Sequence, residues 1–319
     1  MDFRAYKLST IESNFKKTLN AAGRQFKASS GEFPGVVRLT SVDTKGFYCE
    51  EKATKEKIAL HGTAGVLHGD LWALSQNNNH VSVSYVVARD GTIYQLFPDE
   101  YWSYHLGGNS SISNSYWSKH TVAIEVSNLL GLVESKIDPN LLFDTYLKPY
   151  CTKADKDFYT ELPVPYRGYR YWAKFTDAQY DSLNSLLKNL GEKFKLPITH
   201  LPADQAYNFF PGVVPTSLFM HTNCRKDKID FSPSFDISRI GQVVSVEDAN
   251  VAPGVSLPTG APNPGVFITA PASKSVIVKA GDTIWGIAKS HNVSPAALIK
   301  VNPGIDPNKI QVGQEIKLP

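Results

Sequence analysis

Apolar residues recur along the chain with two different periods. Residues 57–64 and 120–128 are short, β-branched apolar runs typical of buried strands. Residues 81–97 favour a β-hairpin with an Asp-Gly pair as its tight turn. Thr176 opens a capping-box pattern before a helix. The apolar stripe of that helix comprises Tyr180, Leu183, Leu187, Leu190 and Phe194. We therefore predict an α/β fold with a central mixed β-sheet flanked by helices.

A change in composition marks the C-terminal quarter of the chain. Residues 247–273 are rich in Pro, Gly and Ala and nearly free of charge, which is typical of a linker. Residues 274–319 predict a small β-α-α-β unit, in which Asp282 or Thr283 caps the first helix.

The remainder of the chain is expected to form one larger domain over residues 51–246. Residues 1–50 have no clean period, and we interpret them as an N-terminal extension. Residues of about 132–172 also lack a period and are interpreted as an insertion in the larger domain.

Composition narrows the function classes. The chain has 319 residues and a net charge of +3, without a block of Lys and Arg, so nothing indicates nucleic-acid binding. Cys49, Cys151 and Cys224 form no CxxC pair. The N-terminal segment lacks the apolar core of a signal peptide, and no apolar run approaches the roughly 18–20 residues that span a membrane. We expect a protein without membrane insertion and without its own export signal.

Two histidines and one aspartate lie at or near the ends of predicted strands, where the backbone would hold metal ligands rigidly. His61 lies where a buried strand enters a Gly-containing loop, and His221 ends another apolar strand. Asp230 follows nine residues later in a basic loop. Two imidazoles and a carboxylate leave a fourth position open, as in catalytic zinc sites. His200 and Cys224 are the weaker alternatives for a ligand.

Five blocks of sequence together carry a resemblance. They are LHGTAG at 60–65, SYVVARDGTIY at 84–94, HLGG at 105–108, VAIEV at 122–126, and His221 with the segment to Asp230. In this order, over about residues 55–240, they resemble the type 2 N-acetylmuramoyl-L-alanine amidases. That family shares its fold with peptidoglycan recognition proteins and with a T7-type phage lysozyme.

The resemblance implies a role for each residue of the site. One Zn2+ ion would be held by His61, His221 and Asp230. Glu125, a lone carboxylate in an apolar strand, would move the proton of the attacking water to the leaving amine. Lys228 would face the developing oxyanion.

One further residue corresponds to the family, and two positions depart from it. His105 corresponds to a family histidine near the substrate cleft, and we expect it to bind substrate. The chain has Phe-Ser-Pro after Asp230, where the family often has Pro-Gly-Pro, so the turn of this loop is expected to differ. Some relatives place a catalytic Tyr where this chain has Val83, which leaves the role of base to Glu125.

The C-terminal unit resembles a LysM module over residues 275–319, on VKAGDTIWGIA, NVS, NP and IQVGQEIKL. Such modules bind glycans that contain N-acetylglucosamine, in a shallow groove between two loops. Trp285 is expected in the core of the module. The groove is expected to be lined by Gly281, Asp282, Thr283, Ile284, Pro303, Gly304 and Ile305.

These features predict a zinc-dependent amidase that cleaves the bond between the lactyl group and L-alanine in peptidoglycan. We expect a monomer, made in the cytoplasm and released to the cell wall or periplasm by another protein, as a phage endolysin is. One alternative is a non-catalytic peptidoglycan-binding protein. Another is a lytic component of bacterial autolysis or of a tail-like injection system.

Overall fold

The computed structural model describes most of the first 243 residues and parts of the C-terminal unit. The described ranges are 3–19, 25–42, 44–243, 275–278, 282–291, 293, 298–299, 301–302, 305–306, 310–311 and 313–318. Within them, no helix has both the length and the apolar character needed to cross a bilayer.

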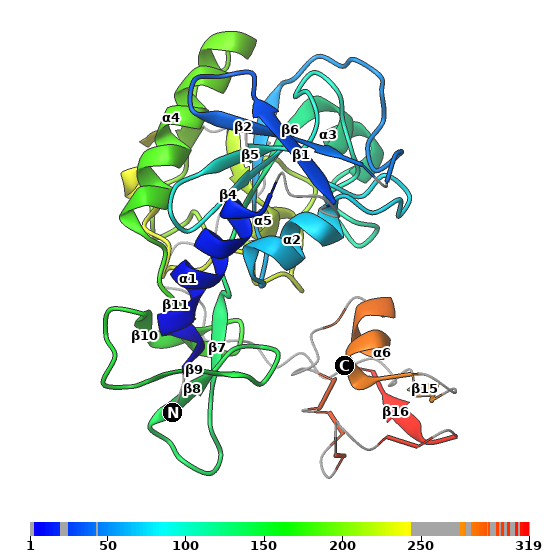
Figure 1. Cartoon of the computed structure of the whole chain (residues 1–319), viewed down its shortest axis with the longest axis vertical. Coiled ribbons are helices and arrows are strands. Elements are labelled where there is room, and N and C mark those ends of the chain that lie inside the picture. The colour runs from blue at the N-terminus through cyan, green and yellow to red at the C-terminus, as the bar shows by residue number, and fades with distance from the viewer. Residues whose placement is uncertain are drawn as a thin grey trace.

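A seven-stranded mixed sheet forms the centre of the larger domain, in the order β1-β2-β5-β4-β6-β3-β13 (Figure 1). Its strands are β1 (Phe26–Ser30), β2 (Val36–Ser41), β3 (Lys57–Gly62), β4 (Tyr85–Val87), β5 (Ile93–Gln95), β6 (Thr121–Val126) and β13 (Leu218–Met220). β3 runs parallel to β6 and β13, whereas β4 and β5 form the expected antiparallel hairpin. The predicted mixed sheet is confirmed.

The two faces of this sheet are covered differently. Ile58 and Leu60 of β3 pack in the core shared with α4 (Asp177–Phe194). Ala59 faces the opposite side and packs in a cluster that includes Trp117 of α3 (Asn114–His120). Because side chains alternate along a strand, His61 lies on the side of Ala59, away from α4.

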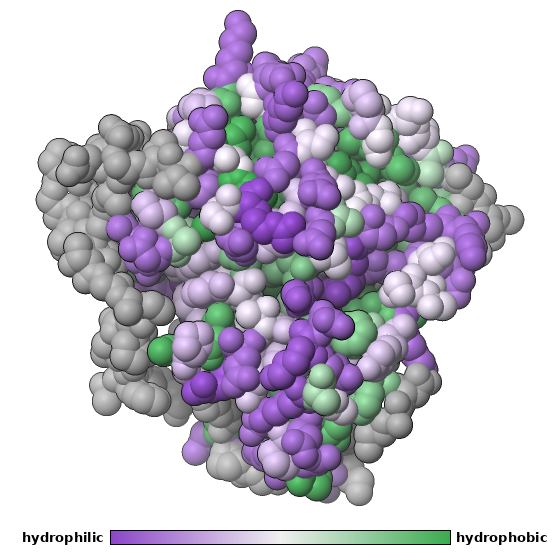
Figure 2. Space-filling model, turned by 90° about the vertical axis from the view of Figure 1, so that its left-hand side faces the viewer, coloured by the Kyte–Doolittle hydropathy of each residue, from purple (hydrophilic) through white to green (hydrophobic). Residues whose placement is uncertain are grey.

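The capping box predicted at the start of α4 is present. The Thr176 hydroxyl accepts a hydrogen bond from the Gln179 backbone N–H, and the Gln179 side chain accepts one from the Thr176 N–H. The buried stripe of the helix packs on the sheet. Figure 2 shows the side of the molecule on which α4 lies in Figure 1, and this face is largely hydrophilic with hydrophobic residues interspersed.

The first fifty residues contribute to the central sheet. β2 pairs in parallel with β5, and β1 pairs with β2 as the edge strand. Ahead of them, α1 (Arg4–Lys17) packs near α2 (Leu67–Leu74). The segment interpreted as an extension therefore widens the sheet by two strands.

A second, five-stranded sheet occupies the segment expected to be an insertion. Its order is β10-β11-β7-β8-β9. Its strands are β7 (Gly131–Glu134), β8 (Leu141–Phe143), β9 (Pro149–Thr152), β10 (Tyr159–Tyr166) and β11 (Tyr169–Ala173). β12 (Thr199–His200) and β14 (Gln242–Val243) form a short parallel pair, and a 3-10 turn covers Ile237–Arg239.

In the C-terminal unit, β15 (Ser275–Ile277) and β16 (Glu315–Lys317) pair antiparallel, and α6 (Ile284–Ser290) follows β15. The Gly286 N–H donates to the Thr283 hydroxyl, so Thr283 is the cap of this helix. The predicted linker and most of the second helix lie outside the described residues.

One carboxylate of α1 is buried against this fold. Glu12 is 2% exposed, and within the described ranges neither side-chain oxygen has a hydrogen-bond partner. Burial raises the pKa of Glu12 to about 7. Since this value exceeds that of the unfolded chain, the associated stability is complete below pH 4.5 and is lost as the pH rises through 7.

We therefore expect Glu12→Gln to stabilise the protein at pH 8 by up to about 3 kcal/mol and at pH 5 by about 1 kcal/mol or less. Melting temperatures at the two pH values measure this difference. Glu192→Gln, at an exposed position of α4, is the matched control and should change neither. An equal shift of the Glu12 variant at both pH values would show that the carboxylate is not the cause.

Candidate metal centre and active site

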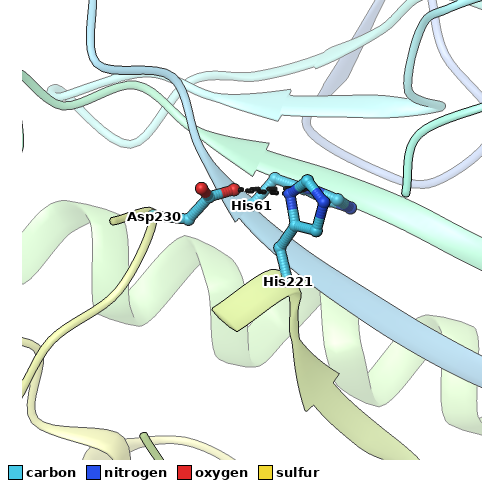
Figure 3. Close-up of side chains that lie close together, drawn as sticks. All are labelled: His61, His221 and Asp230. Carbon is cyan, nitrogen blue, oxygen red and sulfur yellow. Dashed lines mark hydrogen bonds and ion pairs between the residues drawn. The ribbon is translucent and has the colours of Figure 1, made fainter. Parts of the chain in front are cut away.

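The three expected metal ligands converge at one end of the central sheet. β3 and β13 are parallel neighbours with Leu60 opposite Met220, so the residues that follow, His61 and His221, lie at the same edge. His221 begins α5 (His221–Cys224). Figure 3 shows Asp230 reaching from the following loop toward both imidazoles.

The ligand atoms are spaced as a tetrahedral ion requires. The Nδ1 atoms of His61 and His221 are 3.0 Å apart. Asp230 Oδ2 lies 2.9 Å from His221 Nδ1 and 3.5 Å from His61 Nδ1. Ligands bound about 2.0–2.1 Å from zinc in a tetrahedron stand roughly 3.3 Å apart. Among the described residues, these three form the group of His, Cys, Asp or Glu side chains able to share one ion.

The two alternative ligands are engaged elsewhere. Cys224 Sγ donates a hydrogen bond to the His221 carbonyl oxygen, at 3.3 Å. His200 Nδ1 lies 2.8 Å from the Leu201 carbonyl oxygen. Neither belongs to the group around Asp230.

The glycine after His61 permits the close approach of the Asp230 loop. A Cβ atom on Gly62 would lie 2.5 Å from the Asp230 carbonyl oxygen, which is closer than real contacts allow. The backbone of Asp230 therefore packs where any other residue would place a side chain, and this brings the carboxylate beside the imidazoles.

A chain of hydrogen bonds fixes the tautomer of His61. The Thr121 hydroxyl donates to the Trp117 carbonyl oxygen at 2.6 Å, so Thr121 accepts from the N–H at His105 Nε2, 2.7 Å away. Neutral His105 then accepts at Nδ1 from the N–H at His61 Nε2, at 2.9 Å. The lone pair of His61 Nδ1 is left to face the metal centre.

The second histidine is oriented in the same way. His221 Nε2 donates to the Leu106 carbonyl oxygen at 3.0 Å, which leaves the lone pair on Nδ1. Two imidazole lone pairs and a carboxylate oxygen thus converge. A shared proton or a metal ion would relieve the repulsion among them, and a donor set of two imidazoles and one carboxylate fits one divalent ion.

Burial and mutual contact hold these groups in their metal-binding protonation states. Burial lowers the pKa of His61, and it lowers that of His221 to about 4. Burial alone would raise the pKa of Asp230, but the adjacent His221, His61 and Lys228 hold it well below its ordinary value. Neutral imidazoles beside an ionised carboxylate are the forms that coordinate zinc.

Glu125 stands next to this centre on β6. It is the register partner of His61, so both side chains project from the same face of the sheet. Glu125 Oε2 is buried, and no partner for it is found in the described part of the chain. Burial, together with Asp230 and Asp70, raises the pKa of Glu125 well above its usual range. A carboxylate with one buried oxygen and a raised pKa, beside a candidate metal site, is suited to proton transfer.

The other expected residues of the site are placed as follows. Lys228 is half-buried, and its charge acts on both Asp230 and Glu125. Val83 is buried in the apolar core and adds no ionisable group. Both ring nitrogens of His105 are hydrogen-bonded within the protein, to His61 and to Thr121. Substrate binding by His105 stays a prediction, and neither nitrogen is left to contact a substrate.

The predicted glycan groove is only partly described. Ile284 is buried in the small core of the C-terminal unit, and Ile305 packs against that core. Thr283 caps α6, and Asp282 precedes it. Gly281, Pro303, Gly304 and the side chain of Trp285 lie outside the described residues.

Sequence reasoning missed the residues that orient the ligands. Thr121 and the Leu106 carbonyl fix the tautomers, and Arg167 bonds to the loop between His221 and Asp230. A Thr and a backbone carbonyl carry no sequence signal for such a role. Arg167 precedes a glycine between two aromatic runs, a hairpin pattern that was available in the sequence.

Comparison with known proteins adds two family matches. Residues 51–230 match the N-acetylmuramoyl-L-alanine amidase family, and residues 276–319 match the LysM domain. The chain is 55% identical over 42 residues to an endolysin of Bacillus phage PZA and to the N-acetylmuramoyl-L-alanine amidase XlyB of Bacillus subtilis. This match covers 13% of the chain and spans 16% and 13% of those two relatives.

Two solved structures are similar at low identity. An AmpD structure is 16% identical, with 67% of this chain and 96% of that chain covered and a TM-score of 0.37. The N-acetylmuramyl-L-alanine amidase AmiD from E. coli is 18% identical, with 67% and 66% covered and a TM-score of 0.37. The first family match covers more than half of the chain. The chain therefore belongs to the N-acetylmuramoyl-L-alanine amidase family, with a LysM domain at its C-terminal end.

Proposed function

We propose that this protein is a zinc-dependent N-acetylmuramoyl-L-alanine amidase that hydrolyses the amide bond between the lactyl group of N-acetylmuramic acid and L-alanine in peptidoglycan. The observation that carries the proposal is the convergence of the His61, His221 and Asp230 lone pairs beside Glu125, whose buried Oε2 has no hydrogen-bond partner among the described residues. Membership of the amidase family supports the choice of bond.

In this reaction an unactivated amide must be attacked by water at neutral pH. A zinc ion held by the three ligands would activate that water and polarise the scissile carbonyl. Glu125 accepts the proton of the attacking water and delivers it to the leaving nitrogen, since its pKa is raised by burial. Lys228 offers a positive charge to the developing oxyanion.

The LysM domain supports a role in holding the enzyme on its polymer. Because the two domains share one chain, glycan binding by the C-terminal domain would raise the local concentration of the amidase domain at the wall. We propose that the protein acts as a monomer on the cell wall, and that a phage endolysin released by a partner protein is its context.

The test uses purified full-length protein and isolated peptidoglycan sacculi. We expect loss of turbidity together with new α-amino groups of L-alanine, and no new reducing sugar ends. A strong chelator should stop this release, and equimolar zinc should restore it.

Three outcomes argue against the proposal. Reducing ends without new amino groups would indicate cleavage of the glycan strand. Release that persists after verified removal of metal would exclude the zinc mechanism. Binding to sacculi without any release would support the non-catalytic alternative.

A further inference from the structure

The turn between β10 and β11 reaches out of the five-stranded sheet to the metal centre. Tyr166 and Tyr169 are register partners, which leaves Arg167 and Gly168 as a two-residue loop. This loop belongs to the segment for which sequence analysis offers no function. Its contacts suggest one.

The guanidinium of Arg167 binds three carbonyl oxygens of a single loop. Nη2 donates to the Thr222 oxygen at 2.9 Å, and Nη1 donates to the Arg225 oxygen at 2.7 Å. Nη1 also donates to the Lys228 oxygen. The planar fork of an arginine suits such a set, whereas a lysine ammonium is a single point charge.

These three carbonyls lie in the segment that joins the two metal ligands supplied by this part of the chain. Thr222 directly follows His221, and Lys228 is two residues before Asp230. α5 is only one turn long, so its carbonyl oxygens need partners from outside the helix. Arg167 supplies the partner for Thr222, and it fixes the backbone of Lys228 as well.

The backbone of the turn is held in a conformation that arginine disfavours. Arg167 has φ +47° and Gly168 has φ +90°, the two positive values of a type I′ turn. Asn-Gly is the preferred pair in such turns, and a long side chain at the first position is unusual. A residue kept where its backbone is strained points to a use for its side chain. The Tyr166 ring, 5.2 Å from the guanidinium carbon, helps to orient it.

We propose that Arg167 is a positioning residue through which the five-stranded sheet fixes the loop of residues 222–229, and so sets both the geometry of the metal ligands and the place of Lys228. This inference rests on the proposed function. It assigns to the inserted sheet the task of supporting the active site from outside the central fold.

The turn geometry allows a sharp test. Arg167→Asn removes the guanidinium and creates the preferred Asn-Gly turn, so we expect the hairpin itself to become more stable and not less. Arg170→Asn is the matched control, because Arg170 is an exposed residue of the same hairpin whose hydrogen bond to the Pro163 carbonyl, at 3.3 Å, stays within that hairpin. Arg167→Lys separates charge from the forked geometry.

Zinc affinity is measured by competition with a chelator, alongside the melting temperature of each metal-free protein. We expect Arg167→Asn to weaken zinc binding by about 10- to 100-fold, with a melting temperature equal to that of the control. At saturating zinc, kcat should stay about tenfold low with KM unchanged, since Lys228 is displaced while no substrate contact is lost. Arg167→Lys should rescue little of either property.

Several results would overturn the inference. If Arg167→Asn binds zinc as tightly as the Arg170 control, the loop of residues 222–229 keeps its conformation without Arg167. A metal-free melting temperature well below the control would show that Arg167 supports the fold and not the loop. Full rescue by lysine would reduce the role to charge, and a raised KM with normal kcat would indicate a substrate contact. If the wild type itself binds no zinc, the proposed function fails instead.

Discussion

Replacement of Asp230 by alanine is expected to remove tight zinc binding and to lower kcat by about a thousandfold or more. Asp230 is the only anionic ligand of the three, and it lies within 3.5 Å of both imidazole Nδ1 atoms. A metal-assisted hydrolysis loses several kcal/mol of transition-state stabilisation with its ion, which corresponds to this factor. Metal content after dialysis and amino-group release from sacculi measure the two effects.

Asp204→Ala serves as the matched control. Asp204 is exposed, and it is not part of the ligand group. It should keep its zinc and most of its activity. An Asp230 variant that retains stoichiometric zinc and ordinary turnover would remove this carboxylate from the metal centre.

Glu125→Gln is expected to lower kcat by about 10²- to 10⁴-fold while zinc stays bound. The amide keeps the shape of the side chain but cannot accept the proton of the attacking water. The change also removes a partly buried carboxylate whose pKa is raised, so the variant should be at least as stable as the wild type at neutral pH. Steady-state kinetics, metal content and melting temperature test all three statements.

Glu134→Gln, at an exposed position on β7, is the control and should leave kcat unchanged. A Glu125 variant with normal kcat would mean that another group moves the proton. A variant that loses zinc would instead make Glu125 part of the ligand set. Either result would contradict the role proposed here.

Local sequence patterns predict the elements that build the site. The apolar runs around His61 and Glu125 are β3 and β6, and the Asp-Gly turn joins β4 and β5. The capping box at Thr176 begins α4 at the expected residue. These signals work because each depends on neighbours a few residues apart.

The N-terminal elements and the inserted sheet escape prediction because their burial follows no regular period. The buried positions of α1 are Ala5, Leu8 and Glu12, so a charged residue interrupts the apolar stripe that would reveal a helix. β1 buries only Phe26 of its five residues, and β10 shows no strict alternation. When burial along a strand is irregular, its apolar residues do not alternate, so the sequence shows no pattern that predicts a strand.

Local patterns nominate the three candidate ligands, but only the family resemblance implies that they meet. His61 and His221 are 160 residues apart, and spacing cannot show that they meet. The groups that orient them depend still more on tertiary structure. Thr121 and the Leu106 carbonyl become relevant only after the sheet has placed them beside an imidazole.

β13 is the outermost strand at its edge of the central sheet, and among the sheet's strands it is the last to be synthesised. While a ribosome extends the polypeptide, His61 and Glu125 emerge long before the partner histidine that β13 delivers. The nascent protein accordingly lacks the complete group of candidate metal ligands for most of translation. The group of His61, His221 and Asp230 therefore forms late, only after the final edge strand has docked and the loop to Asp230 has followed it.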